Sequence, residues 1–219
     1  MSNTTEMIDK RATEITRQRY QRLSAFYNLM EALAEKRYHP WRKRLWSQVN
    51  GVDVIEVGVG TGKNIPYYPA DAHVTGIDLT PGMLEHARRK AKTLGLDARV
   101  DLQIGDAQAL DFPDNSFDTA LATFVFCSVP DPVLGLREMK RVVKPDGKIL
   151  LLEHMRSMNP ILGKLMDWLN PIVVRVMGAN INRHTEENIH KAGLEIEQVE
   201  HLDAVGIFRL IVAQVKKSI

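Results

Sequence analysis

Residues 54–62, VIEVGVGTG, constrain the fold of this chain more than any other segment. They begin as an apolar run typical of a buried strand and pass directly into Gly58, Gly60 and Gly62. Glycines let the backbone turn sharply and approach a ligand where a side chain would obstruct it. A dinucleotide-binding G-x-G-x-x-G loop needs glycine at Lys63, and a phosphate-binding G-x-x-x-x-G-K-[ST] loop needs it at Val57. The spacing excludes both loops, so a dehydrogenase is the weakest of the functions considered.

Short runs rich in Val, Ile and Leu alternate with helix-like stretches from residue 52 onward, which is typical of a parallel sheet covered by helices on both faces. Strands are predicted near 52–57, 73–77, 99–104, 117–122 and 148–153. Helices are predicted near 62–67, 81–94 and 132–143, the second with Thr80 as its N-cap. A helix near 185–192 and two strands near 194–201 and 206–215 are expected to close the sheet in antiparallel fashion.

Composition limits the classes of function. The length of 219 residues fits one α/β domain, and the net charge of +2 is too small to indicate nucleic-acid binding. Cys127 is the only cysteine, which excludes an intrachain disulfide, and no residue cluster has metal-binding spacing, so no metal is expected. Because neither a signal peptide nor a spanning segment is evident, we expect a cytoplasmic protein, with a peripheral position at the inner membrane surface as an alternative.

Acidic residues mark the first three predicted strands. Asp78 ends the second strand, twenty residues after Gly58, and Asp106 follows the third. A carboxylate at 78 can accept both ribose hydroxyls of an adenosine, and one at 106 can accept from the adenine amino group. Either could instead be a helix cap. Glu56 lies within an apolar strand, where a buried carboxylate needs polar partners.

These motifs resemble those of the class I S-adenosylmethionine-dependent methyltransferases. The resemblance rests on EVGVGTG, GIDLTPGML, GDAQALDFPDNSFD and REMKRVVKPDGKIL, within residues 50–155. It implies a Rossmann-like, doubly wound, mostly parallel sheet of seven strands with an antiparallel C-terminal strand, preceded by N-terminal helices. It also implies S-adenosylmethionine as cofactor and S-adenosylhomocysteine as product. The residues that it assigns to the cofactor are Glu56, Gly58, Gly60 and Gly62 for the methionine end, Asp78 for the ribose, Asp106 with Ala107 for the adenine, and Met83 for packing on the adenine.

The resemblance implies one methyltransferase domain over residues 1–219. Within it we expect a helical cap at 1–49, a cofactor-binding core at 50–155, an apolar accessory segment at 156–184 and a closing helix with two strands at 185–219. Two segments stand outside the alternation of strands and helices. In residues 11–36, Ile15, Leu23, Phe26, Tyr27, Met30 and Leu33 recur at helical spacing. Residues 160–177 are strongly apolar, and Pro171 is expected to break them.

The methyl acceptor has to be inferred from other segments. The stretch YQRLSAFYNLM, with Tyr20 and Tyr27, is similar to the N-terminal element of phospholipid N-methyltransferases and ubiquinone or menaquinone C-methyltransferases, and departs from it at Gln21 and Asn28. The second half resembles methyltransferases of alkyl thiols. Together these resemblances imply a small or lipophilic acceptor, with a phosphatidylethanolamine-type amine as the leading hypothesis. A quinone carbon and a thiol are the alternatives, and a non-catalytic cofactor-binding scaffold is an alternative of another class.

Several residues are candidates for acceptor binding or catalysis. His154, directly after the fifth strand, could orient the acceptor or take its proton, or it could be structural. Tyr20 and Tyr27 could close over the cofactor, and Tyr27 could contact an ammonium group, or both could be ordinary packing. Arg183 with Asn180 and Asn182 could bind a phosphate or polar headgroup, or belong to a solvated loop.

The first fifty residues are locally basic. They carry ten Lys and Arg residues against five acids, together with Trp41 and Trp46. This pattern fits a helix that contacts an anionic membrane, and it fits equally a helix docked on its own domain.

Overall fold

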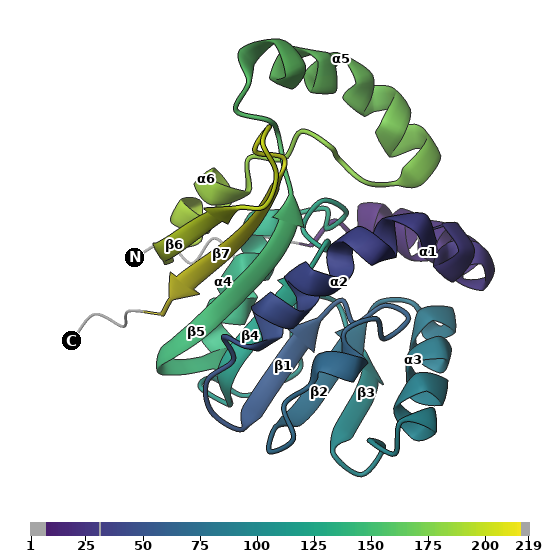
Figure 1. Ribbon diagram of the computed structural model, residues 1–219, viewed down its shortest axis with the longest axis vertical. Coiled ribbons are helices and arrows are strands. Elements are labelled where there is room, and N and C mark those ends of the chain that lie inside the picture. The colour runs from purple at the N-terminus through teal and green to yellow at the C-terminus, as the bar shows by residue number, and fades with distance from the viewer. Residues whose placement is uncertain (1–7, 31, 216–219) are drawn as a thin grey trace.

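A computed structural model of the chain describes residues 8–30 and 32–215. In this part of the chain all strands form one seven-stranded sheet in the order β3-β2-β1-β4-β5-β7-β6 (Figure 1). The strands are β1 (Asp53–Val57), β2 (His73–Asp78), β3 (Val100–Ile104), β4 (Phe117–Thr123), β5 (Val143–His154), β6 (Glu195–His201) and β7 (Phe208–Gln214). β1 to β5 are parallel, and β7 pairs antiparallel with both β5 and β6. The predicted fold class is confirmed.

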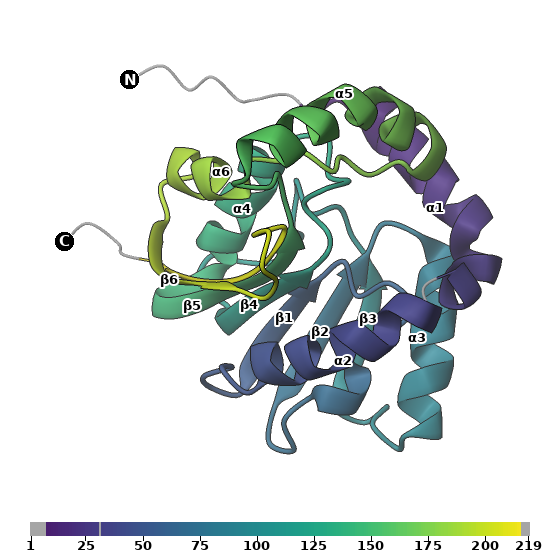
Figure 2. The same ribbon diagram turned by 45° about the horizontal axis from the view of Figure 1, so that its top comes forward.

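Helices cover both faces of the sheet because its strands carry buried side chains on alternating sides. On one face Val54 and Leu150 pack with α2 (Ala32–Trp46), the 3-10 helix η1 (Ile65–Tyr67) and α3 (Pro81–Thr93). On the other face Ile55 and Leu151 pack with α4 (Pro132–Val142) and α6 (Thr185–Lys191). Figure 2 shows α2 crossing one side of the sheet while α4 and α6 lie on the other.

The N-terminal segment forms helices, as expected, and the helical periodicity at 11–36 extends over parts of two of them. α1 runs over Lys10–Met30, and α2 follows it with Pro40 inside. The side chains of Phe26, Met30 and Leu33 lie outside what the structure describes. α2 is docked on the sheet: Leu45 and Trp46 are buried, and Trp41 contacts the ring of Phe208. Of the two tryptophans in this helix, Trp46 is buried and Trp41 is half-buried against Phe208, which fits the alternative of a helix docked on its own domain.

The accessory segment contains a single long helix. α5 runs over Pro160–Met177, so the expected break at Pro171 does not occur. Pro171 removes one backbone donor, and the turns on both sides of it still continue the helix. α5 projects beyond the end of the sheet (Figure 1). Among the described residues, no helix is long and apolar enough to cross a membrane.

Two local predictions need correction. The helix predicted at 62–67 is only the 3-10 turn η1, because the glycine loop continues to Gly62. Thr80 precedes α3 as predicted, but in the described structure its side chain makes no capping hydrogen bond. The amide of Gly82 in the first turn of α3 instead donates to Oε1 of Gln21 on α1, at 3.0 Å. The start of α3 is thus capped from another helix.

Candidate active site

A cleft opens at the carboxyl ends of the parallel strands. It lies where the strand order reverses, between β1 and β4, which is the place where open α/β sheets bind ligands. Residues after β1, β2, β3 and β4 line it, and α1 contributes two tyrosines. The predicted site residues that line this cleft are Tyr20, Tyr27, Gly58, Gly60, Asp78, Met83, Asp106 and Ala107. The sheet thus brings together side chains that are nearly ninety residues apart in sequence.

The glycines of the loop after β1 have different roles. Gly58 and Gly60 line the cleft at φ +71 and +55, in the left-handed region that favours glycine. A Cβ on Gly58 would lie 2.5 Å from Cγ2 of Val125, whereas one on Gly60 would meet no described atom within 4 Å. Gly62 lies outside the set of cleft residues. A Cβ there would meet Ile65 at 2.5 Å, so Gly62 permits close packing of the loop against η1.

Asp78 connects the loops that follow β1 and β2. Its Oδ2 accepts from the amide of Gly60 at 2.9 Å, and its Oδ1 accepts from the amide of Thr80 at 2.8 Å. Burial raises the pKa of this carboxyl above its usual value, and the hydrogen bonds from Thr80 and Gly60 oppose that rise. The side chain of Thr80 also donates to this carboxylate. Of its four acceptor positions one remains, which can still accept from a ligand hydroxyl.

The loop after β3 is held by a similar arrangement. Oδ1 of Asp106 accepts from the amide of Gln108 at 2.9 Å and from its side-chain amide at 3.1 Å. Gln108 also donates to the hydroxyl of Thr13 on α1 at 3.1 Å and accepts from the amide of Asp131 at 3.0 Å. Ala107 and Met83 line the cleft beside this loop and offer it an apolar surface. Such a surface next to a carboxylate suits a flat, polar-edged ring.

α1 extends along the rim of the cleft. Tyr20 and Tyr27 are two turns apart on this helix and both line the cleft, with ring centroids separated by 6.4 Å. Two polar contacts hold α1 in place: Gln21 accepts from Gly82 on α3, and Thr13 accepts from Gln108. Gln21, which departs from the related N-terminal elements, thus has a defined structural role in this protein.

Glu56 lies beneath the glycine loop and is not exposed in the cleft. It is buried on β1, outside the set of residues that line the cleft. Its Oε1 accepts from Asn64 at 2.7 Å, and its Oε2 accepts from the hydroxyl of Tyr68. Burial raises the pKa of this carboxyl to about 7, while the bonds from Tyr68 and Asn64 oppose the rise. Asn64 and Tyr68 therefore supply polar partners that this buried carboxylate needs, and its role at the methionine end of the cofactor stays a prediction.

His154 lies next to the cleft without lining it. Its ring is stacked on Phe124, with centroids 6.3 Å apart, and Phe124 is the residue that faces the cleft. Burial lowers the pKa of His154 to about 4, so the imidazole is neutral at physiological pH. Phe124 lines the cleft and His154 packs on it, so a direct contact of His154 with the acceptor stays a prediction.

Asn180 and Arg183 lie in a neighbouring recess beside α1, and both contact the loop after β4. The backbone amide of Asn180 and its side chain both donate to the carbonyl of Cys127, at 2.9 and 3.0 Å. Arg183 donates to the carbonyl of Val129 at 2.8 Å, and burial lowers its pKa. These bonds position the loop that forms one wall of the cleft, so a headgroup role for the pair stays a prediction.

Sequence reasoning missed two features of the site. Phe124 follows β4 at φ 58 and lines the cleft, although the stretch around it matches no motif. Asn64 is buried beneath the glycine loop, where it binds Glu56, Arg42 and Thr123. The position of residue 124 at the end of a strand beside β1 could have indicated Phe124. Nothing in the sequence indicates that Asn64 connects three distant segments.

Comparisons with known proteins agree with this geometry. A family model described as a methyltransferase domain matches residues 55–151. Phosphatidylethanolamine N-methyltransferase of Cereibacter sphaeroides is 42% identical over 123 residues, which are 55% of this chain and 61% of that protein, so the match spans less than two thirds of that relative. The ubiquinone/menaquinone biosynthesis C-methyltransferase UbiE of Bdellovibrio bacteriovorus is 31% identical over 180 residues, 79% of this chain and 76% of the relative.

A solved structure shows the same fold. The [4+2]-cyclase SpnF superposes with a TM-score of 0.75 at 19% identity, over 93% of this chain and 97% of that one. At this identity the likeness concerns the fold alone.

The cleft fits the cofactor that the family uses. Gly58 and Gly60 form a backbone cradle that leaves space at residue 60, and the carboxylate of Asp78 faces the same space. Asp106 and Met83 lie further along it, beyond the second and third strands. Among the described residues no group of His, Cys, Asp and Glu side chains could hold a metal ion. This chain belongs to the S-adenosylmethionine-dependent methyltransferases.

Proposed function

We propose that this methyltransferase acts on the amine of an ethanolamine-type phospholipid headgroup. The single observation that carries the proposal is the 42% identity over 123 residues to a protein named phosphatidylethanolamine N-methyltransferase. S-adenosylmethionine, when bound, supplies an electrophilic methyl group on a positively charged sulfur. The acceptor nitrogen must approach in its neutral form. Its lone pair forms the new N–C bond as the C–S bond breaks, and the amine proton leaves to solvent.

The residues of this chain bind and orient the reactants in this scheme. Asp78 and the amide-lined glycine loop hold one end of the cofactor, while α1 covers the cleft and excludes water. The rings of Tyr20 and Tyr27 lie at the rim of the cleft. Aromatic rings attract a cation such as the ammonium that forms when the amine is methylated. An aromatic rim therefore favours an acceptor that becomes cationic on methylation over one, such as a quinone carbon, that does not.

A quinone carbon is the second candidate acceptor. It is favoured because the match to quinone methyltransferases covers a larger share of their length. Proteins named as quinone C-methyltransferases match at 30 to 31% identity over 69 to 76% of their own length. Their resemblance includes more of the chain than that of the first relative. Both acceptors are lipophilic, so both suit a protein that works at the surface of a membrane.

The test is methyl transfer from labelled cofactor with defined acceptors. Purified protein is incubated separately with phosphatidylethanolamine vesicles, a demethylated quinone in detergent and an alkyl thiol, and labelled products are identified by mass spectrometry. Asp78→Ala serves as the inactive control. Label in the phospholipid headgroup is the expected result. Label only in the quinone or the thiol would overturn the amine assignment and leave the family membership unaffected.

A further inference from the structure

α5 presents a continuous apolar stripe to solvent. The stripe consists of Ile161, Leu165, Trp168, Ile172 and Val176, whose side chains are 47 to 80% exposed. Their spacings of four, three, four and four residues place them on one side of the helix. Five large apolar side chains on a single exposed helix face are unusual, because monomeric proteins rarely leave contiguous apolar surface open to water.

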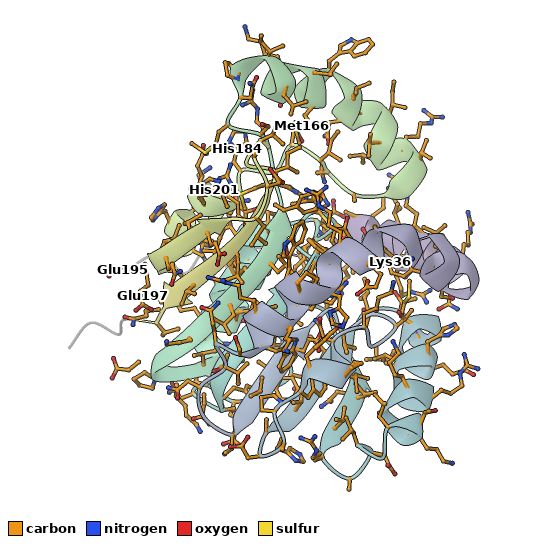
Figure 3. All side chains as sticks on the ribbon, in the orientation of Figure 1. Lys36, Met166, His184, Glu195, Glu197 and His201 are labelled. Carbon is orange, nitrogen blue, oxygen red and sulfur yellow. The ribbon has the colours of Figure 1, made fainter. Side chains whose placement is uncertain are left out.

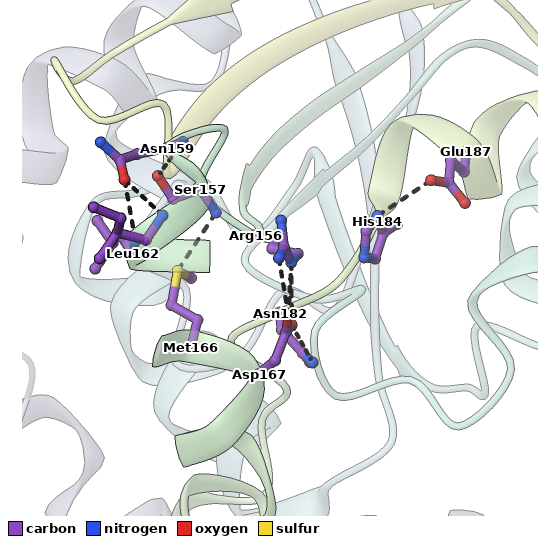
Figure 4. Close-up of polar contacts among 10 residues, drawn as sticks. Arg156, Ser157, Asn159, Leu162, Met166, Asp167, Asn182, His184 and Glu187 are labelled. Atoms are coloured by element: carbon purple, nitrogen blue, oxygen red, sulfur yellow. Dashed lines mark hydrogen bonds and ion pairs between the residues drawn. The ribbon is translucent and has the colours of Figure 1, made fainter. Parts of the chain in front are cut away.

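The opposite side of α5 is fixed to the body of the protein. Met166 points inward and is nearly buried (Figure 3), and its sulfur accepts from the amide of Ser157 at 3.4 Å. Asp167 binds the guanidinium of Arg156 and the side chain of Asn182 (Figure 4). Asn159 caps the start of the helix by accepting from the amides of Ile161 and Leu162. These contacts set the rotation of α5, so the stripe is directed outward.

The exposed charged residues beside the stripe are basic. Lys164 and Arg175 are exposed on α5 near its two ends. Asp167 is the only acid within residues 160–176, and Arg156 forms an ion pair with it. The exposed face is therefore apolar along its centre and positive along one side. That combination is complementary to a bilayer surface of anionic headgroups above acyl chains.

A second copy of this chain fits the stripe less well. Two α5 helices packed face to face around a twofold axis would bring the Lys164 and Arg175 groups of both copies to one interface, and neither copy has an unpaired acid on α5 to neutralise them. A tryptophan at the middle of the stripe is instead typical of a helix at the boundary between headgroups and acyl chains.

We propose that α5 docks on the surface of an anionic phospholipid bilayer, with the stripe inserted at the interface and Lys164 and Arg175 against the headgroups. The docking needs no cofactor and is independent of which acceptor is methylated. Val174 of α5 and Thr16 of α1 line the same recess, and Thr16 also lines the cleft. Docking of α5 would therefore place the cleft at a fixed orientation to the lipid surface.

Vesicle binding of the 219-residue protein without cofactor tests the proposal. We expect it to sediment with vesicles of phosphatidylethanolamine and phosphatidylglycerol. Trp168→Glu and Ile172→Glu should each lower the partition coefficient about tenfold or more, since each removes a large apolar side chain from the interface. Leu94→Glu, which makes the same charge change at the exposed apolar residue directly after α3, should bind like the parent. Equal binding by the stripe variants would overturn the proposal.

Tryptophan fluorescence gives a second readout that does not depend on pelleting. Trp46 is buried and Trp41 is partly buried, so the vesicle-dependent change should come from Trp168. We expect a blue shift and quenching by brominated acyl chains in the parent, and loss of both in Trp168→Phe. Lys164→Glu with Arg175→Glu should weaken binding to anionic vesicles selectively. Sedimentation velocity without lipid must show a monomer, because a dimer abolished by Ile172→Glu would identify the stripe as a self-association surface instead.

Discussion

Gly58 and Gly60 both belong to the cofactor loop and both have a positive φ, but the space for a side chain differs between them. At Gly60 only the positive φ opposes substitution, whereas at Gly58 a Cβ would also overlap Val125. We expect Gly60→Ala to reduce the free energy of unfolding by about 1 kcal/mol. Gly58→Ala should cost about 1 to 3 kcal/mol more because of the overlap. Urea denaturation of the two variants measures the difference.

Gly95 provides the matched control for this comparison. It has φ +67, a Cβ there would meet no described atom within 4 Å, and it lies after α3, away from the cleft. Gly95→Ala should resemble Gly60→Ala in stability and leave cofactor affinity unchanged. Val125→Ala should restore part of the stability that Gly58→Ala loses. If Gly58→Ala is no less stable than Gly95→Ala, the close approach of Val125 does not explain the glycine.

Asp78 should contribute most of any single side chain to cofactor binding. Asp78→Ala removes an acceptor for the cofactor and also the bonds that join the loops after β1 and β2. The loss of a charged hydrogen-bond partner corresponds to about 10- to 100-fold weaker binding. Titration calorimetry with S-adenosylhomocysteine measures it, with Asp97→Ala as an exposed acidic control. Unchanged affinity of Asp78→Ala would contradict the assignment.

The predicted site residues that line the cleft share a physical property. Gly58, Gly60, Asp78 and Asp106 each lie at the end of a strand or within three residues after it, so the strand end restricts their positions, and a linear motif is sufficient to find them. Glu56 and His154 are also adjacent to strand ends, but their side chains turn away from the cleft. The direction of a side chain depends on partners such as Asn64 and Phe124, which no local spacing reveals.

α1 illustrates the same point for whole elements. Helical periodicity predicted a helix in this region, but its attachment depends on tertiary hydrogen bonds, chiefly that between Gln21 and the amide of Gly82. Gln21→Ala should loosen α1 and weaken cofactor affinity about 2- to 10-fold, as expected for one hydrogen bond that is coupled to binding. Hydrogen exchange of α1 with and without S-adenosylhomocysteine, together with calorimetry, measures the effect.

Gln18 supplies the control on the same helix. Its side chain donates only locally, to Glu14 at 2.8 Å, so Gln18→Ala should leave both exchange and affinity unchanged. Equal effects of the two variants would mean that α1 is loosened by general helix destabilisation and that the contact with α3 has no specific role.

Helix boundaries were the least predictable feature of the fold. Proline predicts a helix end, yet both Pro40 and Pro171 lie inside helices. In each helix, tertiary packing holds a turn near the proline. Leu45 and Trp46 are buried after Pro40 in α2, and Met166 is buried before Pro171 in α5. The strands were predicted more closely because each is a short apolar run within a continuous core, although β5 begins five residues earlier than expected, at Val143 instead of 148.

At the scale of the whole molecule, two buried carboxyls link stability to pH. Glu56 and Glu153 lie on opposite faces of the sheet, and burial raises the pKa of each to about 7 from the usual 4.5. Oε1 of Glu153 accepts from the amides of Val125 and Phe126, whereas its Oε2 has no hydrogen-bond partner among the described residues. Glu153 thus positions the loop after β4, which forms one wall of the cleft, and its carboxyl is protonated at a higher pH than usual.

The sign of the pH dependence follows from proton linkage. Between pH 4.5 and 7 these two carboxyls are protonated in the folded protein and ionised in the unfolded chain, so the folded state binds more protons. Their contribution to stability is complete below the unfolded pKa and is lost as the pH rises through about 7. His154, with its pKa lowered to about 4, acts in the opposite direction and loses its contribution as the pH falls through that value.

Glu153→Gln isolates one of these contributions. Glutamine keeps the oxygen that accepts from Val125 and Phe126 and cannot ionise, so the variant should gain stability relative to the parent as the pH rises from 5 to 8. The gain should be on the order of 2 kcal/mol. Urea denaturation at intervals over this range measures it, with Glu197→Gln at an exposed residue of β6 (Figure 3) as the control. Parallel curves for Glu153→Gln and the parent would mean that Glu153 is ionised in the folded protein, with Arg183 as the nearest cation to compensate it.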